Sequence, residues 1–276
     1  MSAVVVSLAL FAAILHATWN AFLRSGGDRL WTVTVMSLAS TVFALPFVFI
    51  YPLPPSGAWL YIVLSAGLQV GYSAFLVAAY RNGELGQVYP IVRGTVPLLV
   101  TLGGFIITGD RLDPYQIAGV VLVALGIMSL ALGKGRASIS SILFALATGT
   151  IIAAYATVDS IGVRQAAQSG AYTAWVLVLY GLFLPAVFVA RRRRLAVDFG
   201  ARETWKALAG GLVAMVAYGV VVAAFALGPA GPITALRETS VVFAVLIGWT
   251  FLGETLTARR VLACVIVAAG TILLGY

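Results

Sequence analysis

The chain consists of apolar stretches that are each long enough to cross a lipid bilayer as an α-helix. A spanning helix needs about 20 apolar residues, because it rises about 1.5 Å per residue through a hydrocarbon core about 30 Å thick. Only 9% of the 276 residues are charged, whereas a soluble domain carries roughly 25%. We therefore predict an all-α integral membrane protein surrounded by a lipid bilayer. Its ten expected transmembrane helices occupy residues 3–23, 30–50, 58–80, 86–108, 115–132, 140–163, 172–190, 206–227, 231–252 and 258–275.

Lysine and arginine gather in alternate loops of this predicted arrangement. The even-numbered loops contain only Arg111 and Arg164. Because cytoplasmic loops collect Lys and Arg, both termini are expected on the outer side of the membrane. The same topological role accounts for the net charge of +8, so we expect no nucleic-acid partner. The odd-numbered loops hold Arg24, Arg29, Arg81, Lys134, Arg136, Arg191 to Arg194, Arg202, Lys206, Arg259 and Arg260.

The two halves of the chain resemble each other in sequence. The tripeptide RGT at 93–95 corresponds to RET at 237–239, and ITGDRL at 107–112 corresponds to FLGETL at 251–256. We therefore expect two copies, residues 1–135 and 136–276, with five spans each. Because five is odd, the second copy would enter the membrane from the opposite side. Such inverted repeats surround the central site of many secondary transporters, which work by alternating access.

With these features the chain resembles the drug/metabolite transporter superfamily, and specifically its EamA-type ten-helix members. The resemblance lies in the two copies, in the stretch HATWNAFLR at 16–24, and in a hairpin that closes each copy. The hairpin residues are Pro90, Pro97, Gly109, Asp110, Leu112 and Gly119 in the first copy and Gly253, Glu254, Leu256 and Gly270 in the second. Among the members, the chain looks most like the bacterial amino-acid exporters of the YddG type.

This resemblance implies a location in the bacterial inner (cytoplasmic) membrane, with both termini on the periplasmic side. It also implies a central cavity lined by spans 1, 3, 4, 6, 8 and 9, with spans 5 and 10 at the periphery. The second copy departs from the pattern, because its ninth span has no counterparts of Pro90 and Pro97. The two halves therefore need not break in the same way.

Helical spacing on span 3 is an independent indication of such a cavity. Gln69, Tyr72, Ser73 and Tyr80 fall within one 100° sector of the helix. Glycine and alanine occupy the opposite side, in the segment GLQVG at 67–71, where a neighbouring helix could approach closely. The polar sector would then face water or ligand. In the alternative interpretation, the amide of the glutamine bonds to another helix.

Other spans carry polar or aromatic side chains on one face. His16 and Asn20 share a face of span 1, Tyr155 lies on span 6 and Tyr218 on span 8, and Tyr89 opens the stretch YPIVRGTVP. A lone histidine is more often an interhelical hydrogen-bond donor than a proton carrier, and aromatic faces of apolar helices often serve packing alone. Both alternatives stay open beside the cavity interpretation.

Asp159 also lies on span 6, one helical turn beyond Tyr155. We place it near the outer end of the span. There it would be hydrated or paired with Arg164, and direct contact with a substrate is the alternative.

Two arginines lie inside predicted spans, where a charge costs about 2.5–3.5 kcal/mol on insertion scales. Arg93 stands between Pro90 and Pro97, which remove backbone donors, so span 4 is expected to kink there. Each arginine could bind an anionic group such as a carboxylate, or it could have a structural role, holding a broken helix together or neutralising Glu238. For Arg237, the adjacent Glu238 and the lack of a nearby proline favour the structural role. For Arg93 the two roles are equally supported.

We expect a secondary exporter of small metabolites, most of all aromatic or hydrophobic amino acids, that functions as a monomer or weak homodimer. The alternatives are an antiporter for phosphorylated metabolites or nucleotide sugars, which needs more cavity Lys and Arg, and a passive channel. No Walker A sequence, histidine cluster or nucleophile beside a base occurs, so we expect neither an enzyme nor a metal or other cofactor. The candidate substrate-binding residues are His16, Asn20, Gln69, Tyr72, Ser73, Tyr80, Tyr89, Arg93, Tyr155, Tyr218 and Arg237.

Overall fold

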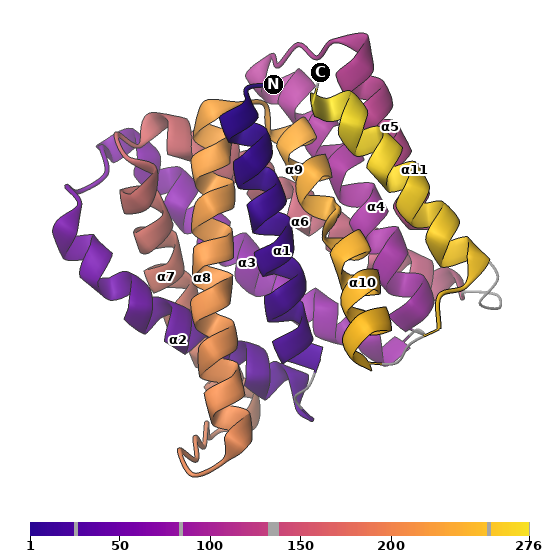
Figure 1. Cartoon of the computed structure of the whole chain (residues 1–276). Helices are drawn as coiled ribbons and strands as arrows, with labels where there is room; N and C mark the ends of the chain where they lie inside the picture. The colour runs from indigo at the N-terminus through magenta and orange to yellow at the C-terminus, as the bar shows by residue number, and fades with distance from the viewer. Residues whose placement is uncertain (25–26, 83–84, 132–137, 253–254, 276) are drawn as a thin grey trace.

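The fold was obtained as a computed structural model and is entirely helical where it is described (Figure 1). It describes residues 1–24, 27–82, 85–131, 138–252 and 255–275, with the backbone alone at 24, 74, 76–82, 85–88, 247–248 and 251–252. The described helices are α1 (Ala3–Arg24), α2 (Arg29–Ile50), α3 (Ser56–Asn82), α4 (Leu85–Gly103), the π-helical η1 (Gly104–Thr108), α5 (Pro114–Ser129), α6 (Ile139–Gln165), α7 (Ser169–Arg192), α8 (Arg202–Leu227), α9 (Ala230–Glu238), α10 (Ser240–Leu252) and α11 (Ala258–Gly275).

Among the described residues, seven helical segments are long and apolar enough to cross a membrane. They are Ala3–Leu23, Arg29–Ile50, Tyr89–Thr108, Ile139–Gln165, Ser169–Arg192, Arg202–Leu227 and Ala258–Gly275. The helix α5 is apolar but shorter. This confirms the predicted all-α membrane class. Each of the ten predicted ranges is occupied by helix, but the number of crossings stays a prediction.

Short polar side chains begin several of the helices. Asp28, Asp113 and Ser138 accept hydrogen bonds from backbone N–H groups two or three residues later, at 2.9 to 3.2 Å. These bonds satisfy donors that have no partner inside the helix. The starts of α2, α5 and α6 are therefore set by local chemistry as well as by the end of each apolar stretch.

A break in helix continuity lies in the ninth span, and the kink expected near Arg93 stays a prediction. The helix α4 is helical throughout and contains Pro90 and Pro97, and it packs against α5, α6 and α9. Packed neighbours can hold a membrane helix that contains proline. The ninth span divides into α9 and α10 at Thr239, whose backbone N–H and side-chain hydroxyl both donate to the carbonyl of Leu236, at 3.1 and 2.6 Å. This tight turn breaks the helix without proline.

Close helix contact through glycine occurs at a different place from the one predicted. A Cβ atom added at Gly67 or Gly71 of α3 would meet no described atom within 4 Å. The expected close approach there is therefore wrong. A Cβ atom at Gly119 of α5, by contrast, would lie 2.8 Å from the carbonyl oxygen of Gly270 in α11. The glycines of α5 and α11 allow these two helices to approach backbone to backbone.

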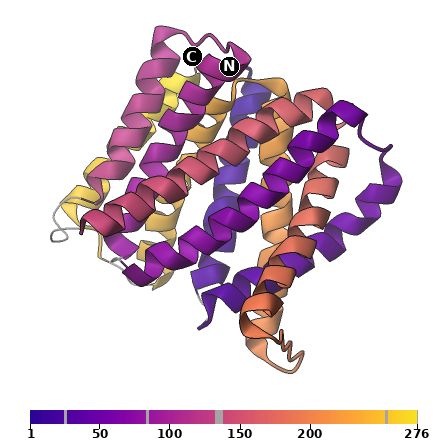
Figure 2. The same cartoon turned by 180° about the vertical axis from the view of Figure 1, so that it is seen from behind.

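The helices pack mainly in pairs. α1 packs against α8, α3 against α6, α2 against α7, and α5 against α11. Both termini lie at one end of the molecule, and the loop between α7 and α8 extends at the other (Figure 1). Seen from behind, α3 and α6 run obliquely beside each other across the molecule (Figure 2). The pair α5 and α11 lies at one edge, as expected for the peripheral spans 5 and 10.

Candidate functional site

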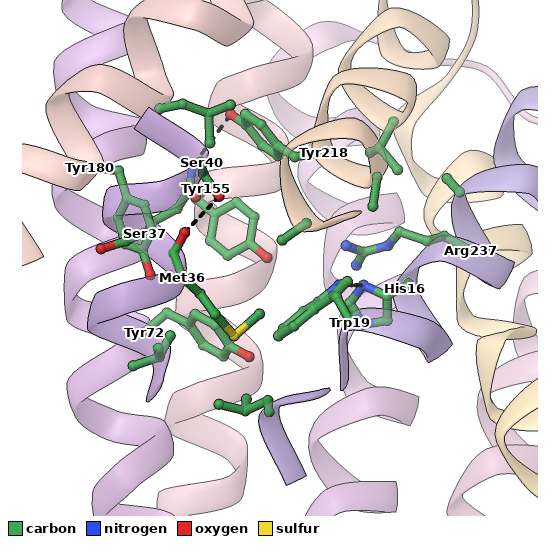
Figure 3. A pocket seen from close by; sticks show the side chains of 18 residues that line it. His16, Trp19, Met36, Ser37, Ser40, Tyr72, Tyr155, Tyr180, Tyr218 and Arg237 are labelled. Carbon is green, nitrogen blue, oxygen red and sulfur yellow. Dashed lines mark hydrogen bonds between the residues drawn. The ribbon is translucent and has the colours of Figure 1, made fainter. Parts of the chain in front are cut away.

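A cavity of about 120 Å³ lies between the helices (Figure 3). Its walls come from α1, α2, α3, α6, α7, α8 and α9, and most of them are apolar or aromatic. The lining includes Ala12, His16, Trp19, Leu23, Val33, Met36, Ser37, Ser40, Gln69, Tyr72, Tyr155, Leu177, Tyr180, Ala214, Ala217, Tyr218, Val221 and Arg237. A second, much smaller cavity of about 10 Å³ is lined by His16, Asn20, Tyr72, Tyr89, Val92, Arg93 and Ile152.

The two intramembrane arginines meet at one carboxylate. Arg93 Nε lies 3.0 Å from Glu238 Oε2, and Arg237 Nη2 donates to Glu238 Oε1 at 3.0 Å. The glutamate is fully buried, and the arginines are 5% and 8% exposed. Two guanidinium groups therefore share a single carboxylate, and this cluster has one more positive charge than negative. Because the break at Thr239 immediately follows Glu238, the helix end places the carboxylate between α4 and α9.

The surroundings of the two arginines differ. Arg93 also donates to the hydroxyl of Ser240 at 3.4 Å, and its guanidinium carbon lies 5.5 Å from the ring centre of Tyr89. Arg237 lines the larger cavity, and among the described residues its Nε has no hydrogen-bond acceptor. In Figure 3 its guanidinium points into the cavity, above His16 and Trp19.

Asp159 is buried, and it does not pair with Arg164. Its exposure is 0%, and its two oxygens accept hydroxyl bonds from Tyr172 and Tyr218, each at 2.9 Å. The expectation of a hydrated or arginine-paired carboxylate is therefore wrong. Asp159 lies beneath the cavity wall, because Tyr218 lines the cavity while Tyr172 is fully buried.

Arg164 instead connects three segments at the end of the molecule that carries the termini. Its Nη1 lies 3.6 Å from an oxygen of Asp110, which follows η1. Its other nitrogens donate to the backbone carbonyls of Phe225 and Gly228 at 3.2 and 2.8 Å. Asp110 of the first half of the chain is thus tied to the second half at this end.

His16 and Asn20 make mostly local contacts. His16 Nδ1 accepts a bond from Trp19 Nε1 at 3.1 Å, and the two rings meet edge to face with centres 5.0 Å apart. Asn20 Nδ2 donates to the carbonyl of His16 at 2.8 Å. The described bonds of the histidine side chain therefore stay within its own helix. They fix its ring against the indole at the cavity wall.

The polar face of α3 bonds to side chains of other helices. Gln69 Nε2 donates to Ser65 at 3.0 Å and to the hydroxyl of Tyr218 at 3.3 Å. The hydroxyl of Ser73 lies 3.1 Å from that of Tyr180. Gln69 thus lines the cavity and bonds to another helix at once, so both interpretations of this residue hold.

The structure gathers most of the expected site residues. His16, Gln69, Tyr72, Tyr155, Tyr218 and Arg237 line the larger cavity, and Asn20, Tyr89 and Arg93 line the smaller one. Ser73 is buried behind the wall, and the side chain of Tyr80 lies outside the described residues.

The sequence reasoning missed the walls formed by α2 and α7. Met36, Ser37 and Ser40 of α2 and Tyr180 of α7 line the cavity, although spans 2 and 7 were not expected there. A signal was present in the serines, which are three residues apart and so share a helical face. Neither helix has an intramembrane charge, and isolated hydroxyls do not distinguish a cavity from interhelical packing.

The described residues contain no group of three or more His, Cys, Asp or Glu side chains that could hold a metal ion. Two guanidinium groups, one carboxylate, several hydroxyls and an aromatic wall are the chemistry of this site. Such a set suits reversible binding of a small amphipathic molecule.

Comparison with known proteins places the chain among membrane transporters. The family model described as "EamA-like transporter family" matches residues 3–132 and again residues 139–276. No curated protein sequence matches the chain. A solved structure described only as "Crystal structure of protein" superposes with a TM-score of 0.74, covering 97% of this chain and 95% of its own, at 18% identity. This likeness shows a shared fold.

Proposed function

Because the chain belongs to the EamA-like transporter family, we propose that it is a secondary exporter of small amphipathic metabolites, above all amino acids with aromatic or hydrophobic side chains. The cavity is the observation that carries this proposal. Its wall combines Trp19, Tyr72 and Tyr155 with the guanidinium of Arg237. Aromatic surface suits an apolar side chain, and little fixed charge suits a zwitterion.

The proposed architecture is ten membrane spans in two inverted repeats, residues 1–135 and 136–276. The helix pairs support it. In such a repeat the first span corresponds to the sixth, the second to the seventh, and so on. The contact between α1 and α8 then corresponds to the contact between α6 and α3. The other pairs, which are α2 with α7, α4 with α9, and α5 with α11, each consist of two corresponding spans. The helices of all these pairs are in contact. The two separate matches to the family model also agree with a duplication.

Transport would follow movement of one repeat against the other around the cavity, as in other inverted-repeat carriers. The excess of Lys and Arg in the odd loops supports a cytoplasmic position for those loops, with both termini outside. In a bacterium this corresponds to the inner membrane with periplasmic termini.

An antiporter for phosphorylated metabolites is the main rival. A phosphate group carries up to two negative charges and is usually bound by several cationic side chains. The arginine cluster has a surplus of only one positive charge, because Glu238 is shared. The cavity is therefore better suited to a carboxylate than to a phosphate.

The experiment is a counterflow assay in proteoliposomes. Uptake of labelled leucine, phenylalanine and threonine is measured with and without the same amino acid trapped inside, and empty liposomes serve as the control. We expect trapped amino acid to stimulate uptake, which a passive channel would not show. Absence of flux for every amino acid, together with flux of a sugar phosphate, would replace this proposal by its rival.

A further inference from the structure

The arginine cluster has one more positive charge than negative. Asp159 lies close enough to attract Arg237 electrostatically, but its oxygens are bonded by the hydroxyls of Tyr172 and Tyr218. Arg93, Arg237 and Glu238 are all at least nine-tenths buried, and they comprise two cations and one anion. A buried charge without a partner is costly, because water no longer solvates it. An anion at this place would complete the cluster.

Arg237 is the arginine available to such an anion. Arg93 Nε, like Arg237 Nε, has no aligned hydrogen-bond acceptor among the described residues. The guanidinium of Arg93 is nevertheless surrounded by Glu238, Ser240 and the ring of Tyr89, and it lines a cavity of about 10 Å³, which is roughly the room of one water molecule. Arg237 has Glu238 on Nη2, and its guanidinium also interacts with the side chain of Tyr155 in the cavity wall.

The exposed part of the Arg237 side chain faces the space where a substrate would bind, whereas its Nε is buried. The residue is 8% exposed, and that exposure is to the cavity of about 120 Å³ (Figure 3). We propose that Arg237 binds the carboxylate of the transported molecule, while Arg93 holds Glu238 and thereby fixes the orientation of Arg237. This inference rests on the proposed function, and it assigns the two arginines different roles.

The same geometry indicates how the rest of the molecule would lie. The His16–Trp19 pair lies below the guanidinium, and Tyr155 faces it across the cavity (Figure 3). The ring of Tyr72 lies 6.2 Å from that of Tyr155. An apolar side chain would contact these rings, and an ammonium group would be attracted to their faces. An α-amino acid with a large apolar side chain is therefore the ligand class.

The test compares ligands that differ only at the carboxylate. Purified wild-type protein in detergent is heated with phenylalanine or with phenylalaninamide, which keeps the ring and the amine. We expect phenylalanine to raise the Tm and to bind about 10- to 100-fold more tightly than the amide, about 1.4–2.8 kcal/mol at 1.4 kcal/mol per tenfold. Equal binding of the two compounds would overturn the inference, whatever the variants show.

Variants then assign the effect to one residue. Arg237→Gln leaves Arg93 and Glu238 as a neutral pair, so the fold should survive, and we expect it to bind the two compounds equally. Arg237→Lys keeps the positive charge but loses the planar guanidinium with its paired donors. Its preference for phenylalanine over the amide should therefore lie between those of the wild type and Arg237→Gln. The exposed Arg202→Gln is the matched control and should retain the wild-type preference.

Failure of this inference differs from failure of the proposed function. If Arg237→Gln catalyses phenylalanine counterflow with the wild-type KM, the carboxylate assignment is wrong while amino-acid transport stands. If the wild-type protein neither binds nor moves any amino acid, both proposals fail together.

Discussion

At the residue scale, Glu238 is the side chain on which the arginine cluster depends. It is 0% exposed and contacts both guanidinium groups at 3.0 Å. Removing one partner of a buried ion pair costs about 3–5 kcal/mol, because the remaining charge loses its compensation. Replacing either arginine instead leaves one balanced pair.

The first prediction concerns the order of stabilities within this cluster. Glu238→Gln leaves two buried positive charges and should lower the Tm more than Arg93→Gln or Arg237→Gln. The double variant Glu238→Gln/Arg93→Gln restores the wild-type surplus of one charge, so it should recover part of the loss. Thermal unfolding in detergent, followed by size-exclusion chromatography, measures this. A double variant less stable than Glu238→Gln would contradict the charge account.

The second prediction separates two tyrosines that donate to the same carboxylate. Tyr172→Phe and Tyr218→Phe each leave one oxygen of Asp159 without its described hydroxyl partner. Each should cost about 1–3 kcal/mol in stability, because the carboxylate is buried. Only Tyr218 lines the cavity, so only Tyr218→Phe should also raise the KM for phenylalanine counterflow. An equal KM effect in both variants would place the cavity boundary elsewhere.

The residue scale also shows what the sequence could predict at the site. An arginine, a glutamine or a tyrosine in an apolar span is recognisable because it is costly there, and most such residues do surround the two cavities. Partner choice was not predictable. Asp159 has polar neighbours in the sequence as near as Thr157, Ser160 and Arg164, but its tyrosine donors come from α7 and α8, which are brought to it by packing.

At the element scale, the glycines of α5 and α11 determine how closely these helices approach. A methyl group at Gly119 would lie 2.8 Å from Gly270 O and 2.7 Å from Leu274 Cγ. Backbone atoms cannot move aside as the end of a flexible side chain can. The two helices must separate to accept a larger residue.

The third prediction compares two glycine-to-alanine changes. Gly119→Ala should destabilise the protein by about 1–3 kcal/mol, the usual cost of overpacking. Gly67→Ala meets no described atom within 4 Å, so it should be neutral or stabilising by up to about 1 kcal/mol through helix propensity. Thermal unfolding of the two variants under the same conditions measures the difference. Equal Tm values would show that α5 and α11 do not pack as closely as described.

Element positions were readable from the sequence, but element continuity was not. Apolar stretches of about 20 residues predicted where helices lie, because backbone groups in lipid must be paired internally. The break at Thr239 was not predicted, because it depends on a hydroxyl bond to Leu236 that composition does not reveal.

At the scale of the whole molecule, Arg164 joins the two halves of the chain at the end that carries the termini. It contacts Asp110 from the first half and the carbonyls of Phe225 and Gly228 from the second. The lining of the large cavity extends along α1 to Leu23, toward the opposite end. Alternating access would require these contacts at Arg164 to separate in part of the cycle.

The fourth prediction follows from this contact. Asp110→Asn removes the ion pair, which is partly exposed and therefore worth about 0–1 kcal/mol. The assay uses a Cys264→Ser background with Val221→Cys in the cavity wall, and an impermeant maleimide is added on the side of the termini. In this background, Asp110→Asn should increase the rate of maleimide labelling by up to about 5-fold. The exposed Asp198→Asn is the control at the opposite end and should not change the rate. An unchanged rate in Asp110→Asn would show that this ion pair does not restrict access.

The duplication that we propose has a consequence for the history of the site. Residue 94 is the counterpart of Glu238 in the first copy, and it is glycine. A Cβ atom there would lie 2.5 Å from Met128 Cγ and 2.8 Å from the carbonyl oxygen of Ala124. An acidic side chain at residue 94 would collide with α5 in the present packing, so only the second copy accommodates the glutamate. Under this proposal the two arginines descend from one ancestral residue, and their roles have diverged, with Arg93 structural and Arg237 binding the substrate.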